Sequence, residues 1–270
     1  MIQVSVIIIN YNTTELTFDC ISSVIEHTHD LVYEIILVDN ASRSFPAEEF
    51  RRLFPAVKLV MSPENLGFAG GNNLGIKQAA GDFILLLNSD TYLKDNAILK
   101  TYEYMLRRPK AGAVSARLVY PDGKHQSVAQ RFPSVKYQLI ELLRLQKLLP
   151  KRSAGRLLLG AFFRHDENTT ADWVWGAYFM FRRELLAKMK DGKLDDTYFM
   201  YYEDMQWCMD IKRLGYEVHF CSDAEVVHLM GGSSGSKKQL MMQYESVFLE
   251  KNYSPLKIRL INTLKRLLTS

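Results

Sequence analysis

Four short apolar runs in the first third of the chain each end on small polar or acidic side chains. They are VSVIIIN (Val4–Asn10), EIILVDN (Glu34–Asn40), VKLVMS (Val57–Ser62) and FILLLNSD (Phe83–Asp90). Strands that are apolar on both faces and alternate with helical segments indicate a parallel sheet covered on both sides. In such sheets the ligand crevice forms beyond the carboxyl ends of the strands. We therefore expect that crevice to be lined by Asp39, Asn65, Asn88 and Asp90.

Each of these side chains also has a simpler interpretation, because Asn and Asp are common in turns. The carboxylate of Asp90 nevertheless follows a strand and stands beside the small Ser89 and the amide of Asn88. Mg²⁺ binds one or two protein carboxylates and completes its shell with water and phosphate oxygens. Asp90 is thus a candidate metal ligand, with a helix cap or turn as the alternative.

Composition narrows the class of protein. The chain has 270 residues, of which 47% are hydrophobic and 24% charged, which predicts one large α/β domain or two small ones. A net charge of +4 gives no support for nucleic acid as a partner. Cys20, Cys208 and Cys221 are too widely spaced for a zinc site or a disulfide framework, and they fit a reducing compartment. Without an evident signal peptide or spanning helix, a cytoplasmic location is expected.

The segment NLGFAGGNNLG (Asn65–Gly75) is rich in glycine but matches neither common phosphate motif. Gly70 and Gly75 have P-loop spacing, yet Ile76-Lys77 follow where Lys-Ser/Thr is required, and G-x-G-x-x-G is absent. The segment could still present backbone N–H groups and Asn side chains to an anion at the start of a helix.

Seven segments carry a family resemblance: VSVIIINYN, EIILVDNAS, NLGFAGGNNLG, LLLNSDTYL, WGAYFMFRRELL, YFMYYEDMQWCMDIKRLGY and VVHLMGGSSG. In this order they resemble family 2 glycosyltransferases of the GT-A fold, above all the rhamnosyltransferase-like branch that builds bacterial surface polysaccharide. The resemblance implies an α/β fold with a single Rossmann-like, mostly parallel sheet flanked by helices. It implies a GT-A domain over 1–235, divided into a nucleotide-binding half (1–118) and an acceptor and catalytic half (119–235). A basic amphipathic helical C-terminal segment would cover 236–270.

The resemblance also implies a role for each matching residue. Donor-binding residues would be Tyr11, Asn12, Asp39, Asn65, Gly67, Gly71, Asn72, Asn73 and Asn88. Among them, Asp39 would accept a hydrogen bond from a uracil or thymine N–H. Asp90 and His228 would bind Mg²⁺ or Mn²⁺, although a lone His at a strand end is often an ordinary hydrogen-bonded residue.

The same resemblance assigns catalysis to Glu203-Asp204. Asp204 would be the base that takes the proton of the acceptor hydroxyl, with Glu203 as its rival or as an orienting group, and Trp175-Gly176 would border sugar and acceptor. Two acids in the first turn of a helix are also stabilised by the helix dipole alone. Two departures from the family pattern stand out: Asn88 replaces the first acid of Asp-x-Asp, and Gln206 stands where this branch usually has Asp.

Two stretches combine leucine with positive charge. The first contains Lys136, Arg144, Lys147, Lys151, Arg152, Arg156 and Arg164, and the second contains Lys251, Lys257, Arg259, Lys265 and Arg266. Basic amphipathic helices bind anionic membrane surfaces, which would place the protein at the inner face of the membrane. An ordinary packed helix or a homodimer contact explains the pattern equally well.

We therefore expect an inverting, metal-dependent glycosyltransferase with a dTDP- or UDP-sugar donor, dTDP-rhamnose first, and a glycan or polyprenyl-linked acceptor. Because of Asn88 and Gln206, the alternative is a non-catalytic nucleotide-sugar-binding or scaffold subunit. A nucleotidyltransferase is a third option, disfavoured because the chain lacks a basic glycine-rich N-terminal loop.

Overall fold

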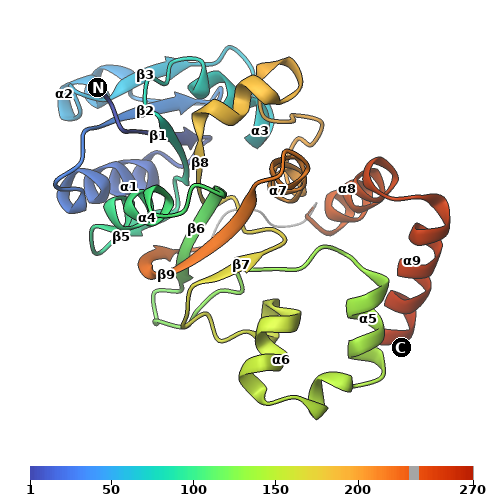
Figure 1. Cartoon of the computed structure of the whole chain (residues 1–270). Helices are drawn as coiled ribbons and strands as arrows, with labels where there is room; N and C mark the ends of the chain where they lie inside the picture. Colours follow the sequence, from blue (N-terminus) through green and yellow to red (C-terminus); the bar gives the residue numbers. More distant parts are fainter. Residues whose placement is uncertain (231–236, 270) are drawn as a thin grey trace.

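The computed structural model describes residues 1–230 and 237–269 (Figure 1). Its strands form one sheet in the order β3-β2-β1-β4-β8-β6-β9-β5, with β7 paired to β9. The strands are β1 (Val4–Asn10), β2 (Tyr33–Asp39), β3 (Lys58–Met61), β4 (Phe83–Asn88), β5 (Thr91–Leu93), β6 (Ala111–Val119), β7 (Thr169–Ala171), β8 (Tyr178–Arg182) and β9 (Glu217–His228).

The first half of the sheet is parallel, as the sequence predicted. β1 lies between β2 and β4, with Asn10 opposite Asp39 on one side and Ile9 opposite Asn88 on the other. This register brings the polar ends of three strands to one edge. Beyond β4 the sheet is mixed, because β8 runs antiparallel to β4 and β6 whereas β6 and β9 are parallel.

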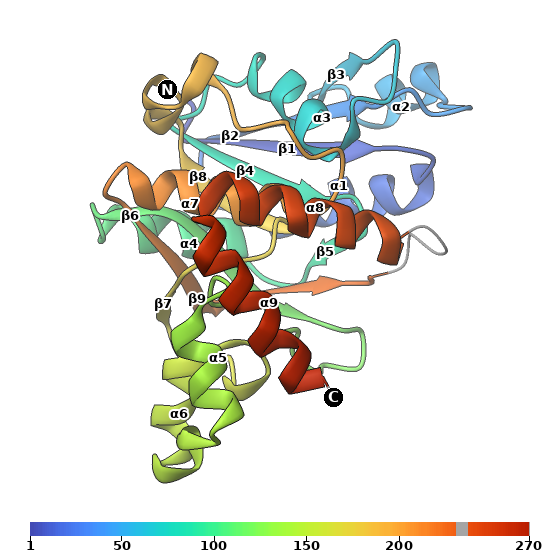
Figure 2. The same ribbon diagram turned by 90° about the vertical axis from the view of Figure 1, so that its right-hand side faces the viewer.

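The helices cover both faces of the sheet, and Figure 2 shows the α3 and α7 side. They are α1 (Thr14–His27), α2 (Ala47–Leu53), α3 (Gly67–Ile76), α4 (Ala97–Leu106), α5 (Val135–Leu142), α6 (Lys151–Leu158), α7 (Glu203–Arg213), α8 (Lys237–Asn252) and α9 (Pro255–Thr269). Short 3₁₀ turns occur at Leu145–Leu148, Gly160–Phe162, Arg183–Lys188 and Lys190–Gly192. The main core is formed by aliphatic side chains of β1, β2 and β4 with the aromatic side chains of β8 and Trp207 of α7. Burying such a side chain contributes about 1.5–3 kcal/mol.

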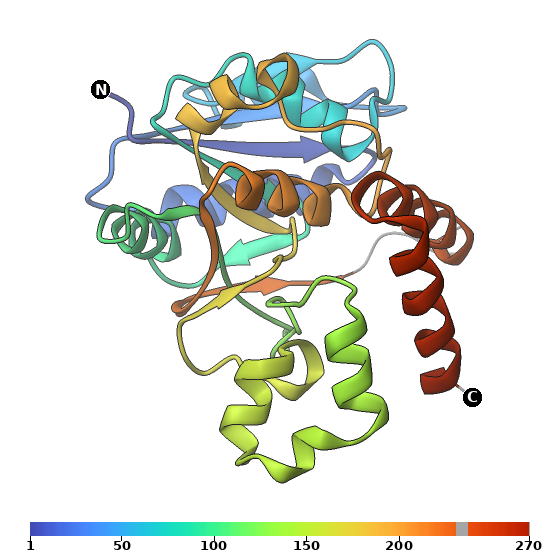
Figure 3. The ribbon, with the colours of Figure 1, turned by 45° about the vertical axis from the view of Figure 1, so that its right-hand side comes forward.

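The chain ends in a helical extension, α8 and α9, that packs beside α5 (Figure 3). A second apolar cluster joins the extension to the sheet domain and contains Tyr198, Met205, Phe248, Leu249 and Ile261. The segment 231–236, which holds the Gly-Gly-Ser-Ser sequence after His228 and the expected boundary at 235, lies outside the described residues.

No helix in the described part of the chain is long and apolar enough to cross a membrane.

Candidate active site

The ends of β1 and β2 are joined by a buried polar network. Nδ2 of Asn10 donates to Oδ1 of Asp39 at 2.7 Å and to the Ser42 hydroxyl at 3.0 Å. The backbone N–H of Ser42 donates to Oδ2 of Asp39 at 3.2 Å. Each carboxylate oxygen can accept more than one hydrogen bond, so Asp39, only 1% exposed, keeps acceptor capacity for a ligand N–H.

Tyr11 and Asn12 form the surface above this network. Asn12 has a φ of 57°, its N–H donates to the Ser42 hydroxyl at 2.9 Å, and its Oδ1 accepts from the backbone N–H of Arg43 at 2.9 Å. The Tyr11 ring is 45% exposed. An exposed aromatic ring on a loop held at both sides is suited to stacking on a flat ligand.

Asn65 and Gly67 form the entry to α3. Asn40 donates from Nδ2 to Oδ1 of Asn65 and to the Gly67 carbonyl, both at 3.0 Å. Gly67 has a φ of 71°, and a Cβ there would lie 2.3 Å from the Phe199 carbonyl oxygen. Phe68 donates its N–H to that same oxygen at 2.8 Å. The glycine thus permits α3 to start directly against the 195–202 segment.

Gly71, Asn72 and Asn73 lie on the buried side of α3. A Cβ on Gly71 would meet Ile9 Cδ1 at 2.8 Å, so this glycine allows α3 to lie close to β1. Nδ2 of Asn72 donates to the Phe68 carbonyl at 3.0 Å. Asn73 exchanges two hydrogen bonds with the backbone of Leu194, at 2.8 and 3.1 Å. These three residues therefore fix the position of α3. The start of the helix, and not its buried side, faces the crevice.

Asp90 and His228 are brought together by the pairing of β5 with β9, in which Thr91 lies opposite His228. Nε2 of His228 is 3.4 Å from Oδ1 of Asp90. Gln126 lies behind the ring: its Nε2 donates to the His228 carbonyl at 2.8 Å, so its Oε1 faces Nδ1 of His228, also at 2.8 Å. Nδ1 must therefore carry a proton, which leaves Nε2, on the side of Asp90, as the ring nitrogen that could bind a metal.

This corner fits a divalent cation. Oδ1 of Asn88 is buried and receives no hydrogen bond from the described residues, which leaves an oxygen for a cation or its water. A carboxylate, an imidazole nitrogen and an amide oxygen are suitable ligands for Mn²⁺ or Mg²⁺. Within the described ranges no group of three or more His, Cys, Asp or Glu residues gathers for a metal, so phosphate and water would complete the shell.

The start of α7 is held by an unusual backbone. Tyr201 and Tyr202 have φ of 73° and 72°, both in the left-handed region, immediately before Glu203 begins the helix. Left-handed residues other than Gly cost roughly 1–2 kcal/mol each. Asp204 is fixed from two sides, because its Oδ2 accepts from Gly176 N–H at 3.0 Å and its Oδ1 from Met205 N–H at 2.8 Å.

Burial changes the acidity of both acids. Removal from water raises the pKa of Asp204 to about 6, partly opposed by hydrogen bonds from backbone N–H groups including those of Gly176 and Met205. Glu203 is 6% exposed, and its Oε2 has no hydrogen-bond partner among the described residues. Burial, and next the negative charge of Asp204, raise the pKa of Glu203 well above its usual value. A pKa near 6 suits a base that works at neutral pH.

Trp175 and Gly176, the other two residues predicted beside the catalytic acids, lie near Asp204. Gly176 lies so close to Asp204 that a Cβ would be 3.3 Å from the Cβ of Asp204. Trp175 is partly buried against the main core. The carbonyl oxygen of Ala177 accepts a hydrogen bond from Asn88 N–H at 3.0 Å. The 175–177 segment therefore connects the Asp90 corner with Asp204.

Gln206 is directed away from the acids. Its Oε1 accepts from Nδ2 of Asn252 at 2.8 Å and from the Tyr198 hydroxyl at 3.3 Å, and its Nε2 donates to Asp210 at 2.9 Å. The side chain is fully buried between α7 and α8. In this chain Gln206 fastens the C-terminal extension to the helix that carries Asp204.

The model of the family "Glycosyl transferase family 2" matches residues 5–190, which is more than half of the chain. The chain belongs to this family. All the strand ends described above, except that of β9, lie within the matched region.

Characterised relatives agree with this assignment. The N-acetylglucosaminyl-diphospho-decaprenol L-rhamnosyltransferase of Mycobacterium tuberculosis is 25% identical over 225 residues, covering 74% of this chain and 68% of the relative. The rhamnosyltransferase WbbL of Escherichia coli K12 is 24% identical over 174 residues, 60% of each chain. The protein is thus a rhamnosyltransferase-like family 2 glycosyltransferase.

Solved structures confirm the fold. GalNAc-T7, solved with UDP, GalNAc and Mn²⁺, superposes with a TM-score of 0.68 at 15% identity over 93% of this chain and 48% of that one. The expected GT-A fold with a helical C-terminal extension is therefore confirmed, with a mixed sheet.

Three residues of the site, Gln126, Asn10 and Asn40, were not predicted from the sequence. Asn10 and Asn40 end two of the recognised strands, so their positions offered a signal. Gln126 lies in a loop far from His228 in sequence and belongs to no motif, so only the fold shows its partner.

Proposed function

We propose that this glycosyltransferase is an inverting, divalent-metal-dependent enzyme in which Asp204 is the catalytic base. The observation that carries the proposal is Asp204 itself, a partly buried carboxylate at a helix start, held by two backbone N–H groups, with a pKa raised to about 6. In the inverting reaction Asp204 takes the proton of the acceptor hydroxyl while the hydroxyl oxygen attacks C1 of the sugar from the face opposite the nucleotide. The bond between C1 and the nucleoside diphosphate breaks as the new bond forms, and the nucleoside diphosphate leaves. Hydrogen bonds from Gly176 and Met205 hold the carboxylate in place for that step.

The donor is proposed to bind across the ends of β1, β2 and β4. Asp39 would accept from the base, Tyr11 and Asn12 would contact base and ribose, and the start of α3 would lie along the diphosphate. Asp90, His228 and, through water, Asn88 would hold Mg²⁺ or Mn²⁺. Such a cation, when bound, neutralises charge on the leaving nucleoside diphosphate. Trp175 and Gly176 would border the transferred sugar.

The proposed donor is a dTDP- or UDP-sugar, with dTDP-rhamnose first, and the acceptor a glycan or polyprenyl-linked glycan of bacterial surface polysaccharide. The names of the two relatives support the rhamnosyl donor, and one relative acts on a diphospho-decaprenol acceptor. The test is a thermal-shift and donor-hydrolysis screen of nucleotide sugars with and without Mn²⁺. Stabilisation or turnover by dTDP-rhamnose that requires Mn²⁺ and disappears in Asp90→Ala is expected. The donor proposal fails if another nucleotide sugar alone gives this response.

The non-catalytic scaffold remains a defined alternative. It predicts nucleotide-sugar binding without donor hydrolysis and without transfer to any acceptor. Measurable metal-dependent hydrolysis of any donor would exclude it. Gln206, one of the two residues that suggested this alternative, is directed to Asn252 rather than to the site and so gives it no support.

We also propose that α5, the turn after it, and α9 contact an anionic membrane surface at the inner face. Leu143, Leu148 and Leu256 are 62%, 82% and 68% exposed. By contrast, Arg152 and Arg156 both bind Glu167, which offsets one of their two positive charges. Leu148→Asp combined with Leu256→Asp should abolish sedimentation with anionic liposomes. Leu53→Asp, at a 46% exposed site on α2, should not. Unchanged sedimentation of the double variant would refute the membrane contact.

A further inference from the structure

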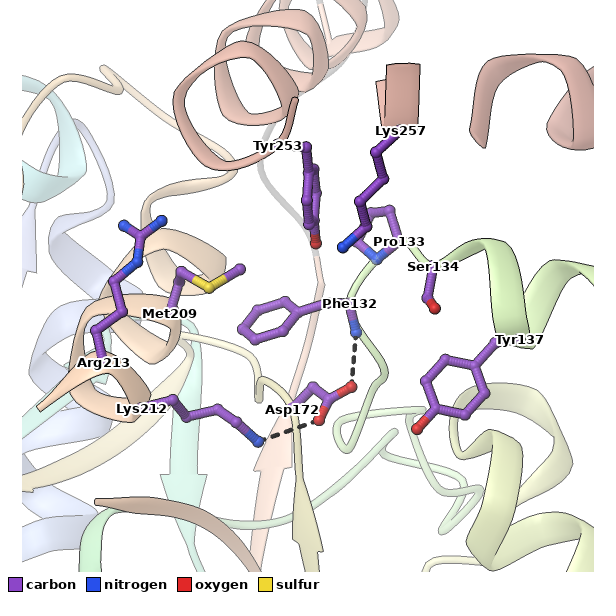
Figure 4. A pocket seen from close by; sticks show the side chains of 10 residues that line it. All are labelled: Phe132, Pro133, Ser134, Tyr137, Asp172, Met209, Lys212, Arg213, Tyr253 and Lys257. Carbon is purple, nitrogen blue, oxygen red and sulfur yellow. Dashed lines mark hydrogen bonds and ion pairs between the residues drawn. The ribbon is translucent and has the colours of Figure 1, made fainter. Parts of the chain in front are cut away.

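A cavity lies apart from Glu203 and Asp204. It measures about 400 Å³ and lies between the start of α5, the C-terminal half of α7 and the start of α9 (Figure 4). Its lining includes Phe132, Ser134, Tyr137, Asp172, Tyr253 and Lys257. Phe248 separates it from the start of α7, because this ring packs on Phe132 at 6.2 Å and on Tyr202 at 5.9 Å. The cavity is thus a different site from the one around Asp204.

Every aromatic ring in the lining has a cation over its face. The pairs are Lys212 over Phe132 at 6.0 Å, Arg131 and Lys136 over Tyr137 at 5.5 Å each, and Lys257 over Tyr253 at 4.0 Å. Such contacts hold the long cationic side chains along the walls. Positive charge is therefore concentrated around a small volume.

The single acid of the lining does not neutralise this charge. Oδ1 of Asp172 lies 3.1 Å from Nζ of Lys212 and 3.7 Å from Nη1 of Arg131, and its Oδ2 accepts from Phe132 N–H at 3.1 Å. Within the described ranges no carboxylate forms an ion pair with Lys136 or Lys257. Figure 4 shows the Lys257 ammonium beside the Tyr253 hydroxyl, directed away from α9. The cavity thus has hydroxyl donors and more positive charge than the single carboxylate of Asp172 offsets.

The geometry points to a binding site for the phosphate or diphosphate ester of an amphiphile in this cavity. Charged N–H groups and hydroxyls are the usual donors to phosphate oxygens, and the volume is within the range of small-ligand sites. The rings of Phe132 and Tyr253 contact the apolar part of the ligand. Two of the three helices that frame the cavity lie beside exposed leucines, Leu143 directly after α5 and Leu256 on α9. The ligand is therefore lipid-borne, from either a bilayer phospholipid or a lipid-linked diphosphate.

The test uses calorimetric titration of the full chain with geranyl diphosphate and with pyrophosphate. EDTA is present throughout, so that binding through a metal at Asp90 does not contribute. Wild type should bind both, and Lys257→Ala should weaken binding about tenfold, the usual effect of losing a charged hydrogen bond. Lys257→Arg should restore it. Arg259→Ala, which removes the same charge from the same helix outside the lining, should leave it unchanged.

A vesicle assay separates the two sources. If Lys257→Ala also loses binding to phosphatidylglycerol-containing vesicles relative to phosphatidylcholine alone, the ligand is a phospholipid headgroup. If only geranyl diphosphate binding falls, the ligand is a lipid diphosphate. The proposal is overturned if wild type binds neither soluble diphosphate, or if Lys257→Ala binds both as tightly with an unchanged thermal midpoint. No sugar donor is used, so this outcome is independent of the proposed transfer reaction.

Discussion

The backbone N–H of Gly176 donates a 3.0 Å hydrogen bond to Oδ2 of Asp204. This bond links the segment that leads into β8 to α7, the helix that carries Asp204. It also fixes the direction of the carboxylate. A partly buried carboxylate held by backbone donors can be both oriented and basic at neutral pH.

The transfer rate should rise with pH through an apparent pKa near 6. Burial raises the pKa of Asp204 to about 6, and only the deprotonated form can accept the acceptor's proton. We expect kcat/KM to fall about tenfold per pH unit well below 6 and to level off above 7. The measurement is product formation between pH 5 and 8. A flat profile would contradict the assignment.

The same pKa shift predicts a change in stability with pH. The pKa of Asp204 is higher in the folded protein than in the unfolded chain. The protonated carboxyl therefore contributes to the free energy of unfolding in full below pH about 4, and this contribution is lost as the pH rises through about 6. The loss is on the order of 2 kcal/mol. Asp204→Asn cannot ionise and should therefore lose less stability than wild type between pH 4.5 and 7 in urea unfolding. Parallel pH curves for the two proteins would refute the raised pKa.

Replacing Gln126 should weaken metal binding without touching a metal ligand. Gln126 fixes the proton of His228 on Nδ1, which leaves Nε2 available as a ligand. Loss of such a partner typically costs 10–100-fold in metal affinity. Gln126→Leu should show this loss in Mn²⁺ titration with nucleotide present, whereas the exposed Gln78→Leu should not. Equal Mn²⁺ affinity of Gln126→Leu and wild type would exclude the role.

Gly67 should tolerate no side chain. Gly67→Ala places a methyl group 2.3 Å from the Phe199 carbonyl oxygen at a φ of 71°. Gly123→Ala is the matched control, because its φ is 83° but nothing lies within 4 Å. The control should lose roughly 1–2 kcal/mol from backbone strain alone, and Gly67→Ala distinctly more, as measured by urea unfolding. Equal losses of stability in Gly67→Ala and Gly123→Ala would contradict the close contact at Gly67.

The sequence was sufficient to predict the strands of the parallel half of the sheet and the positions of two acidic residues at the ends of elements. The four apolar runs predicted β1 to β4. For β1, β2 and β4 the reason is that parallel strands buried on both faces have few alternatives, whereas β3 is an edge strand whose ends, Lys58 and Met61, are exposed. Asp90 and Asp204 were recognisable because each stands at the end of a strand or the start of a helix within a family segment. The sheet beyond β4 was not predictable in the same way, because the order β8-β6-β9 depends on long connections.

Side-chain partners distant in sequence were also beyond prediction. Gln206 was interpreted as the loss of a family carboxylate, but the docking of α8 turns its amide to Asn252. Asn73 was assigned to the diphosphate by resemblance, and the structure engages its amide with Leu194, 121 residues away. These contacts arise from tertiary packing, which local patterns do not encode.

The most direct test of the account is sugar transfer by Asp204→Asn. The assay measures product by mass spectrometry with a donor that wild type uses, together with donor binding by calorimetry. Asp210→Asn, the same change on the same helix at a residue that contacts Gln206, is the control. We predict that Asp204→Asn binds donor as wild type does but transfers at least about 100-fold more slowly, while Asp210→Asn remains active. Transfer at the wild-type rate by Asp204→Asn would contradict the central claim.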